Sequence, residues 1–254
     1  MQQSNSYIFK YIIALTLGCA IVLSLAFEAL KDKQAANVAL EKRGFILATF
    51  MGNEALTDFK PEDINATFEK RVKGVVVNYK GETVEQNAEQ LDIAKEYKKL
   101  PEERVYPIYL IKDEKGDAIV NYVLPVYGFG LWDNIWGYVA LKGDLNTIQG
   151  IVFDHKAETP GLGARITTPE IQSRYQGKTI ADENGNIVAV VMKKGENGGG
   201  DKSIEAFKNN PHEVDGMSGA TLTGNGINNM LSDYLKSYAN YFQKLKKSQT
   251  AQLN

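Results

Sequence analysis

The best candidate for chemistry is the run Asp-Gly-Met-Ser-Gly-Ala-Thr-Leu-Thr at residues 215–223, because its hydroxyl groups stand just ahead of an amphipathic segment. The apolar residues that follow have the three-and-four spacing of a packed helix: Ile227, Met230, Leu231, Tyr234, Leu235, Tyr238, Phe242 and Leu245. The helix is therefore expected to begin between Thr221 and Gly226. Unpaired N–H groups and the helix dipole at such a start attract an anion such as phosphate, and Gly219 and Ala220 let it approach closely.

Helix physics alone also offers a simpler interpretation of this run. A serine or threonine ahead of a first turn commonly caps the helix by accepting a hydrogen bond from a backbone N–H, and no ligand is then needed. On the spacing alone, the cap is the more economical explanation.

A second stretch, Glu-Thr-Pro-Gly-Leu-Gly at residues 158–163, combines a rigid proline with permissive glycines. This composition exposes backbone N–H and C=O groups on a tight turn. Such a turn fits the polar edge of a ligand, and it fits an ordinary β-turn equally well.

The pattern Asp-x-x-Ser-Gly-Ala-Thr that ends at Thr221 resembles the flavinylation motif of FMN-binding domains. In those domains the last threonine carries FMN through a phosphoester bond made by a flavin transferase. The resemblance implies that Thr221, and not Thr223, is the attachment point. It also implies that the neighbouring residues shape and cap the loop: Asp215, Ser218, Gly219, Ala220, Leu222 and Thr223.

The stretch 155–163 is similar to the other signature of that domain. The resemblance implies that this loop meets the pyrimidine side of the flavin ring, with Thr159 and the backbone at Leu162 as contacts. The predicted binding loop also contains Glu158, Gly161 and Gly163.

Two further side chains are weighed as flavin contacts. Trp132 either shields or stacks on the ring, or it belongs to the core or an interface. Lys193, near the end of a predicted strand, either lies close to the anionic flavin or phosphate, or is a solvated strand end.

A third group of segments narrows the resemblance: Gly-Phe-Gly-Leu-Trp at 128–132, Trp-Gly-Tyr at 136–138 and Asp-Leu-Asn-Thr at 144–147. With the N-terminal apolar run, these resemble the C subunits of sodium-translocating NADH:quinone oxidoreductases. That family implies electrons that come from NADH on another subunit, pass through iron–sulfur or iron centres to this FMN, and reach quinone through a second flavin, coupled to sodium export. No catalytic residue is expected in this chain, and other subunits of the complex are its expected partners.

Two alternatives stay open. The homologous G subunit of the ferredoxin:NAD oxidoreductase complex shares the anchor and both flavin motifs. A non-redox, membrane-tethered interaction module, with the threonine motif acting only as a helix cap, is a different class of function.

Composition excludes several other functions. A formal net charge of −2 provides no general attraction for nucleic acid. Only His155 and His212 offer imidazole ligands and only Cys19 offers a thiol, so neither a metal site nor an iron–sulfur cluster is expected. Residues 195–203 look superficially like a nucleotide-phosphate loop, but Asp201 replaces the required glycine, so a flexible loop is expected there.

The N-terminal region is expected to anchor the chain. Residues 11–27 are uncharged and mostly apolar, and residues 11–30 are just long enough to span a membrane once. A cleavable signal peptide is the alternative, although no clear cleavage site follows the run. The flanking lysines do not decide the orientation. The family resemblance implies that residues 1–10 are cytoplasmic and that the large domain lies on the periplasmic face of a bacterial inner membrane.

The remaining pattern predicts an α+β domain whose central, largely antiparallel sheet is flanked by helices. Residues 31–104 are expected to form a mixed membrane-proximal part, with helices at 34–51 and 61–70, a strand at 75–79 and a mobile or helical surface excursion at 82–100. Residues 105–247 are expected to form the FMN-binding domain. Its predicted elements are a hairpin at 105–127, strands at 137–142, 149–154 and 187–193, and a short helix at 169–175. Residues 248–254 are expected to be a disordered tail.

Overall fold

The computed structural model describes residues 4–196 and 204–252. The chain divides into two compact units, Met1–Lys42 and Arg43–Asn254, and each is described by itself. Helix α1 (Asn5–Met51) begins in the first unit and ends in the second. The loop predicted at 195–203 lies, from residue 197 onward, outside the described residues.

In the first unit, α1 exposes a continuous apolar surface. Leu17, Ile21 and Leu25 are among its exposed side chains. Within the described residues, α1 is the helix that is long and apolar enough to cross a membrane, judged by length and composition. The predicted N-terminal apolar helix is therefore confirmed, while its place in a membrane stays a prediction.

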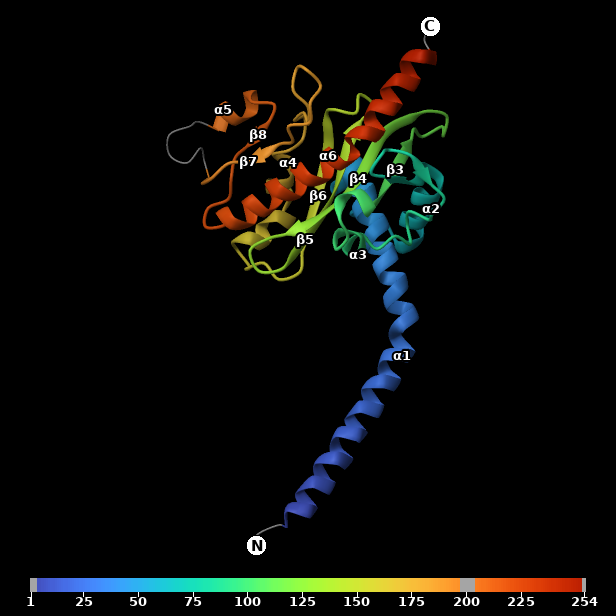
Figure 1. The fold of residues 1–254 in the computed structure, drawn as a ribbon, viewed down its shortest axis with the longest axis vertical. Helices are drawn as coiled ribbons and strands as arrows, with labels where there is room; N and C mark the ends of the chain where they lie inside the picture. Colours follow the sequence, from blue (N-terminus) through green and yellow to red (C-terminus); the bar gives the residue numbers. More distant parts are fainter. Residues whose placement is uncertain (1–3, 197–203, 253–254) are drawn as a thin grey trace. The chain divides into compact units, whose positions relative to one another are not determined.

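The second unit is built on a six-stranded sheet in the order β2-β1-β3-β4-β5-β6, in which all neighbouring strands are antiparallel (Figure 1). The strands are β1 (Val72–Asn78), β2 (Thr83–Val84), β3 (Val105–Lys112), β4 (Ile119–Phe129), β5 (Asn134–Lys142) and β6 (Ile148–His155). The β3–β4 hairpin is closed by Asp113, whose Oδ1 accepts a hydrogen bond from Gly116 N at 2.7 Å. The predicted α+β fold with an antiparallel sheet is confirmed.

Side chains of the central strands alternate between two buried clusters, as the pleat requires. Ile108 and Leu124 point into a larger cluster with α6 (Thr221–Gln252), and Tyr109 and Val123 point into a smaller one with the end of α1. The apolar stripe predicted for the last helix is the face that α6 packs on the sheet (Figure 1). The sheet is thus covered on both faces.

The other elements are short. The helices are α2 (Pro61–Arg71), α3 (Ile93–Tyr97), α4 (Pro169–Ser173) and α5 (Ile204–Asn209), and the 3-10 turns are η1 (Glu54–Leu56), η2 (Pro101–Glu103) and η3 (Gly163–Thr167). Strands β7 (Val191–Met192) and β8 (Glu213–Val214) form a separate parallel pair. The excursion predicted at 82–100 contains β2 and α3, and the buried Glu96 fixes it by accepting a hydrogen bond from Val105 N at 3.1 Å.

The structure differs from the expected boundaries in three places. The part 31–104 is not separate from the domain, because β1 pairs with β3 along its whole length, a long-range pairing that local pattern does not reveal. The strand predicted at 187–193 is reduced to β7, because Ala189 has a φ of 55° and breaks the extended run. The predicted tail is helical to Gln252, because no glycine or proline after Lys247 ends α6.

Two prolines interrupt the β3–β4 ladder, and α6 compensates for them. Pro107 and Pro125 have no N–H to donate across the strands. The buried hydroxyl of Tyr238 reaches both of their carbonyl oxygens, at 3.0 and 2.9 Å. This contact fixes α6 to the centre of the sheet.

Replacing Tyr238 with phenylalanine should lower the free energy of unfolding by about 1–3 kcal/mol, because it leaves buried carbonyl groups without a donor. Tyr234 is the matched control: it is also a buried tyrosine of α6, but its hydroxyl has no hydrogen-bond partner among the described residues. Tyr234→Phe should be neutral or slightly stabilising. Urea unfolding of the full chain in detergent measures both, and equal losses would contradict the role given to Tyr238.

Candidate functional site

The β4–β5 loop and the predicted flavin loop at 158–163 lie together because the strands before them end side by side in the sheet. Phe129 at the end of β4 pairs with Asn134, and Ile135 at the start of β5 pairs with His155 at the end of β6. The β4–β5 loop and the segment after β6 therefore start side by side. The first turn of α6 reaches the same edge, where Gly226 lies against the carbonyl of Phe129.

The carboxylate of Glu158 joins these three segments. Its Oε1 accepts hydrogen bonds from the backbone N–H groups of Leu131 and Trp132, at 2.8 and 3.0 Å. Its Oε2 accepts one from the hydroxyl of Thr223 at 2.6 Å. Glu158 is only 4% exposed and Thr223 only 1%. A carboxylate this buried needs strong donors, and these contacts, here called the Glu158 clamp, supply them.

Glycines make room for the clamp. A side chain at Gly130 or Gly163 would collide with the carboxylate of Glu158. Gly161 has a different role, because its φ of 76° turns the loop in a conformation that other residues rarely adopt. The two predicted glycines of this loop, Gly163 and Gly161, therefore serve packing and turning, respectively.

Thr221 is the first residue of α6 and is partly exposed. The turn before it uses Gly219 with a φ of 72°, and the first helical bond runs from Gly224 N to the carbonyl of Ala220 at 3.0 Å. Ala220 is therefore the N-cap residue, and its methyl group cannot accept a hydrogen bond from the first turn. The side chain at the N-cap position therefore cannot satisfy the N–H groups at the start of α6, as a serine or threonine there would.

The two threonines of the motif differ in accessibility. The hydroxyl of Thr223 is buried and donates to Glu158. Thr221 has a partly exposed side chain at the helix start. Of these two threonines, Thr221 is the one with solvent-exposed surface.

Exposed apolar side chains surround these loops. They are Phe129, Leu131, Trp132, Leu162 and Leu222, here called the apolar rim. Trp132 is 68% exposed, and its Nε1 donates to the hydroxyl of Thr159 at 3.1 Å. Leu162 lies so close to Gly219 that a Cβ there would be 2.8 Å from Leu162 Cδ2. Exposed apolar groups gathered in this way are typical of a binding surface.

Sequence reasoning missed a charged network beside the motif. Arg165 donates two hydrogen bonds to Glu196, at 2.6 and 2.9 Å, and Arg174 donates a third at 3.1 Å. Glu196 also accepts a hydrogen bond from Ser218 N at 3.1 Å. The hydrogen bonds from Arg165 are the main cause that lowers the pKa of Glu196 to about 2, so this carboxylate is charged near neutral pH. These residues are far apart in the chain and share no sequence motif, so their contacts could not be predicted from the sequence.

Other candidates lie at the margin of this arrangement. Lys193 forms an ion pair with Glu213 at 2.9 Å, which occupies its ammonium group in the structure. His155 Nδ1 accepts a hydrogen bond from Glu158 N at 3.2 Å and so supports the loop. Among the described residues, no cluster of three histidine, cysteine or acidic side chains could hold a metal ion.

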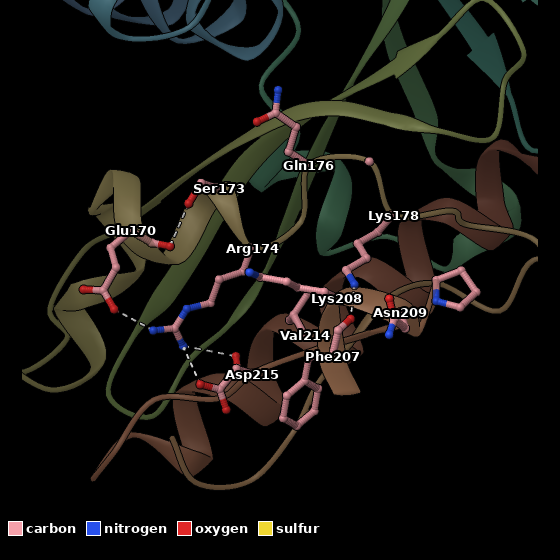
Figure 2. A pocket seen from close by; sticks show the side chains of 12 residues that line it. Glu170, Ser173, Arg174, Gln176, Lys178, Phe207, Lys208, Asn209, Val214 and Asp215 are labelled. Atoms are coloured by element: carbon pink, nitrogen blue, oxygen red, sulfur yellow. Dashed lines mark hydrogen bonds and ion pairs between the residues drawn. The ribbon is translucent and has the colours of Figure 1, made fainter. Parts of the chain in front are cut away.

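A cavity of about 520 Å³ borders the motif from the α4 side. Figure 2 shows Arg174 reaching across it from α4 towards Glu170 and Asp215. Asp215 is the predicted site residue in its lining, and the Glu158 clamp and the apolar rim lie outside it. Lys178, also in the lining, donates to the carbonyls of Phe207 and Asn210 at the end of α5, and burial lowers its pKa.

Comparisons with known proteins support the resemblance noted in the sequence. A model of the FMN-binding domain matches residues 130–236. The C subunit of the Na(+)-translocating NADH-quinone reductase of Vibrio vulnificus is 32% identical over 241 residues, 88% of each chain. The corresponding C subunit of Pseudomonas aeruginosa is 32% identical over 257 residues, 92% of each chain.

Solved structures give the same picture. The crystal structure of the C subunit of the Na(+)-translocating NADH-quinone reductase from Parabacteroides distasonis has a TM-score of 0.69 and 30% identity, covering 84% of this chain and 96% of that one. Shewanella oneidensis NqrC has a TM-score of 0.68 and 27% identity, covering 82% and 98%.

Removing the clamp should destabilise the domain. Glu158→Ala should lower the free energy of unfolding by about 2–4 kcal/mol, because two backbone N–H groups and a buried hydroxyl lose their acceptor. Thr159→Ala, next along the chain, removes only an exposed contact with Trp132 and should cost no more than about 0.5 kcal/mol. Urea unfolding, followed by tryptophan fluorescence, measures the free energy of unfolding of both variants. If Glu158→Ala lowers it no more than Thr159→Ala does, the stabilising role of the Glu158 clamp is refuted.

Proposed function

Because the chain belongs to the family of C subunits of Na(+)-translocating NADH-quinone reductases, we propose that it carries FMN in phosphoester linkage to Thr221 and passes electrons within such a complex. The observation that carries the proposal is the start of α6, where an accessible Thr221 follows an N-cap alanine. The FMN-binding domain model covers this turn and the 158–163 loop. The chain acts as one subunit of an oxidoreductase and has no complete activity of its own.

The helix start supports attachment of a phosphate. The N–H groups of the first turn and the positive end of the helix dipole stabilise negative charge there. A phosphodiester at Thr221 retains one negative charge, which these groups would offset. Gly219 and Ala220 provide small residues next to it, and the clamp at Thr223 holds the turn in place.

The loops around Thr221 fit the ring of FMN. The apolar rim offers Trp132, Leu162 and Leu222 to a flat aromatic surface. The backbone of the 159–163 loop offers polar groups to the pyrimidine edge. When bound, FMN supplies one-electron and two-electron redox chemistry, and this chain binds, orients and partly shields it. Lys193, which is paired with Glu213, is the weakest of the proposed contacts.

The proposed partners follow from the family. Other subunits would supply the NADH site, the iron centres, the second flavin and the quinone site, and the complex would export sodium. A flavin transferase would attach FMN. The apolar part of α1 would anchor the chain once in a bacterial inner membrane, with residues 1–10 in the cytoplasm and the large domain on the periplasmic face.

Two alternative functions have less support than the proposed one. The relatives compared above are C subunits, which favours the quinone reductase over the homologous G subunit of the ferredoxin:NAD oxidoreductase. A non-redox interaction module would need the motif only as a helix cap. Ala220 at the N-cap position argues against that explanation, because alanine is among the poorest capping residues.

Intact mass and peptide mapping test the covalent link. The full chain, expressed with a flavin transferase and then denatured, should gain the mass of FMN less water on the peptide that contains Thr221. Thr221→Ala should abolish the gain completely, because no acceptor oxygen remains. Fragmentation of the wild-type peptide should place the added mass on Thr221 and leave Thr223 unmodified, because the buried Thr223 hydroxyl already donates to Glu158. An unmodified wild-type peptide, under conditions that modify a known acceptor protein, would favour the interaction module.

Membrane extraction tests the anchor. The full chain should stay with membranes in alkaline carbonate, and a chain that lacks residues 1–42 should become soluble, because the apolar surface of α1 is then removed. A chain that lacks residues 248–254 is the control and should remain in the membrane. Protease added to spheroplasts should digest the large domain, and protection of that domain would overturn the proposed periplasmic orientation.

A further inference from the structure

Residues 215–220, which form the turn before α6 and are here called the motif turn, are held on their N-terminal side by Arg174 and Glu196 of the charged network. Arg174 donates to the carbonyl of Asp215 at 3.3 Å and to that of Gly216, and Glu196 accepts from Ser218 N. Figure 2 shows the guanidinium of Arg174 between Glu170 and Asp215. Three positions around the turn are thus fixed by two side chains from other segments.

The segment that carries Glu196 is itself packed on the turn. Lys193 N donates to the carbonyl of Val214 at 3.0 Å, which extends the β7–β8 pairing towards the motif. Gly216 lies directly against the carbonyls of Lys193 and Gly195, where a Cβ has no room. Glu196 follows at the end of this close contact and therefore reaches Ser218 from a fixed backbone.

Thr221 lies between two carboxylate contacts. Upstream, Glu196 holds Ser218; downstream, Glu158 holds Thr223. The intervening residues include Gly219 in the left-handed conformation, which offers little resistance to movement if either contact is lost. The position of the Thr221 hydroxyl therefore depends on both.

We propose that Glu196 is a positioning residue for FMN transfer to Thr221: by holding Ser218 N, it sets the turn so that the Thr221 hydroxyl is presented for attack. The inference rests on the proposed function. In the transfer, the Thr221 oxygen attacks the phosphorus of an FMN phosphoanhydride held by the transferase. A new P–O bond to Thr221 forms, the anhydride P–O bond breaks, the phosphate-bearing leaving group departs with the bonding electrons, and the hydroxyl proton passes to a base or to water.

The network keeps the nearby negative charge low. Arg165 and Arg174 face Glu196 and Glu170, and Arg174 also lies 3.8 Å from the carboxylate of Asp215, so two positive charges offset most of the charge of three carboxylates. Glu196 can therefore hold the turn without strongly repelling an incoming phosphoryl group. Glu170 contacts the same arginines but not the motif turn, and its side chain is 62% exposed. It is a natural control for the loss of one carboxylate from the network.

The test is the kinetics of FMN transfer to the full chain in detergent, with purified transferase and flavin adenine dinucleotide as donor. Glu196→Ala should lower kcat by about tenfold or more, since small misplacements of a nucleophile are costly, and leave KM for the chain within about twofold. Glu170→Ala should leave both within about twofold of the wild type. Partial unfolding of the substrate would instead raise the apparent KM and leave kcat unchanged.

An unchanged kcat for Glu196→Ala, or an equal fall for Glu170→Ala, would overturn the inference. If Glu196→Ala does not fold, Glu196→Asp replaces it: this variant keeps the charge but withdraws the carboxylate, and it should lower kcat by about threefold or more while Glu170→Asp does not. A wild-type chain that accepts no FMN would overturn the proposed function and this inference with it. A modified wild type with an equally fast Glu196→Ala would overturn only the inference.

Discussion

The buried carboxylate of Glu158 is the constraint on which the site depends. Polar oxygens this far from water are stable only if donors surround them, so the β4–β5 loop supplies two backbone N–H groups and the first turn of α6 supplies the Thr223 hydroxyl. The same constraint requires glycine at 130 and 163, where any side chain would enter the carboxylate's space. One buried carboxyl group thereby constrains the composition of three loops.

The sheet holds the loops that surround Glu158 close together, because these loops begin at the paired ends of β4, β5 and β6. The pairs Phe129–Asn134 and Ile135–His155 bring the loops together before any side chain of the site acts. On the sheet, α6 is fixed by its apolar stripe and by Tyr238, which bonds the carbonyls of two prolines. The loops that carry the site are therefore short extensions of packed elements, and the start of α6 has little freedom relative to the strands.

Local pattern could predict most of this framework, since the antiparallel hairpin, the stripe of α6 and a helix start between Thr221 and Gly226 all follow from residue spacing. It could not predict that β1 joins the same sheet, or that Arg165, Arg174 and Glu196 meet at the motif, because those contacts join residues far apart in the chain. The resemblance to FMN domains identified the two loops. It did not reveal that Glu158 and Thr223 contact each other, which only the fold shows.

Spacing left open the choice between a helix cap and a phosphate site, and the positions of the hydroxyl groups around the start of α6 favour the proposed phosphate site. A capping motif needs its oxygen at the residue whose carbonyl accepts the first helical bond, and here that residue is Ala220. Thr223 is turned to Glu158, and Thr221 lies one position inside the helix. The sequence thus gives up a cap worth about 1 kcal/mol at this end of α6. Uncapped N–H groups beside an accessible hydroxyl make physical sense if an anion is to occupy the helix start, and that is what a phosphoester at Thr221 would supply.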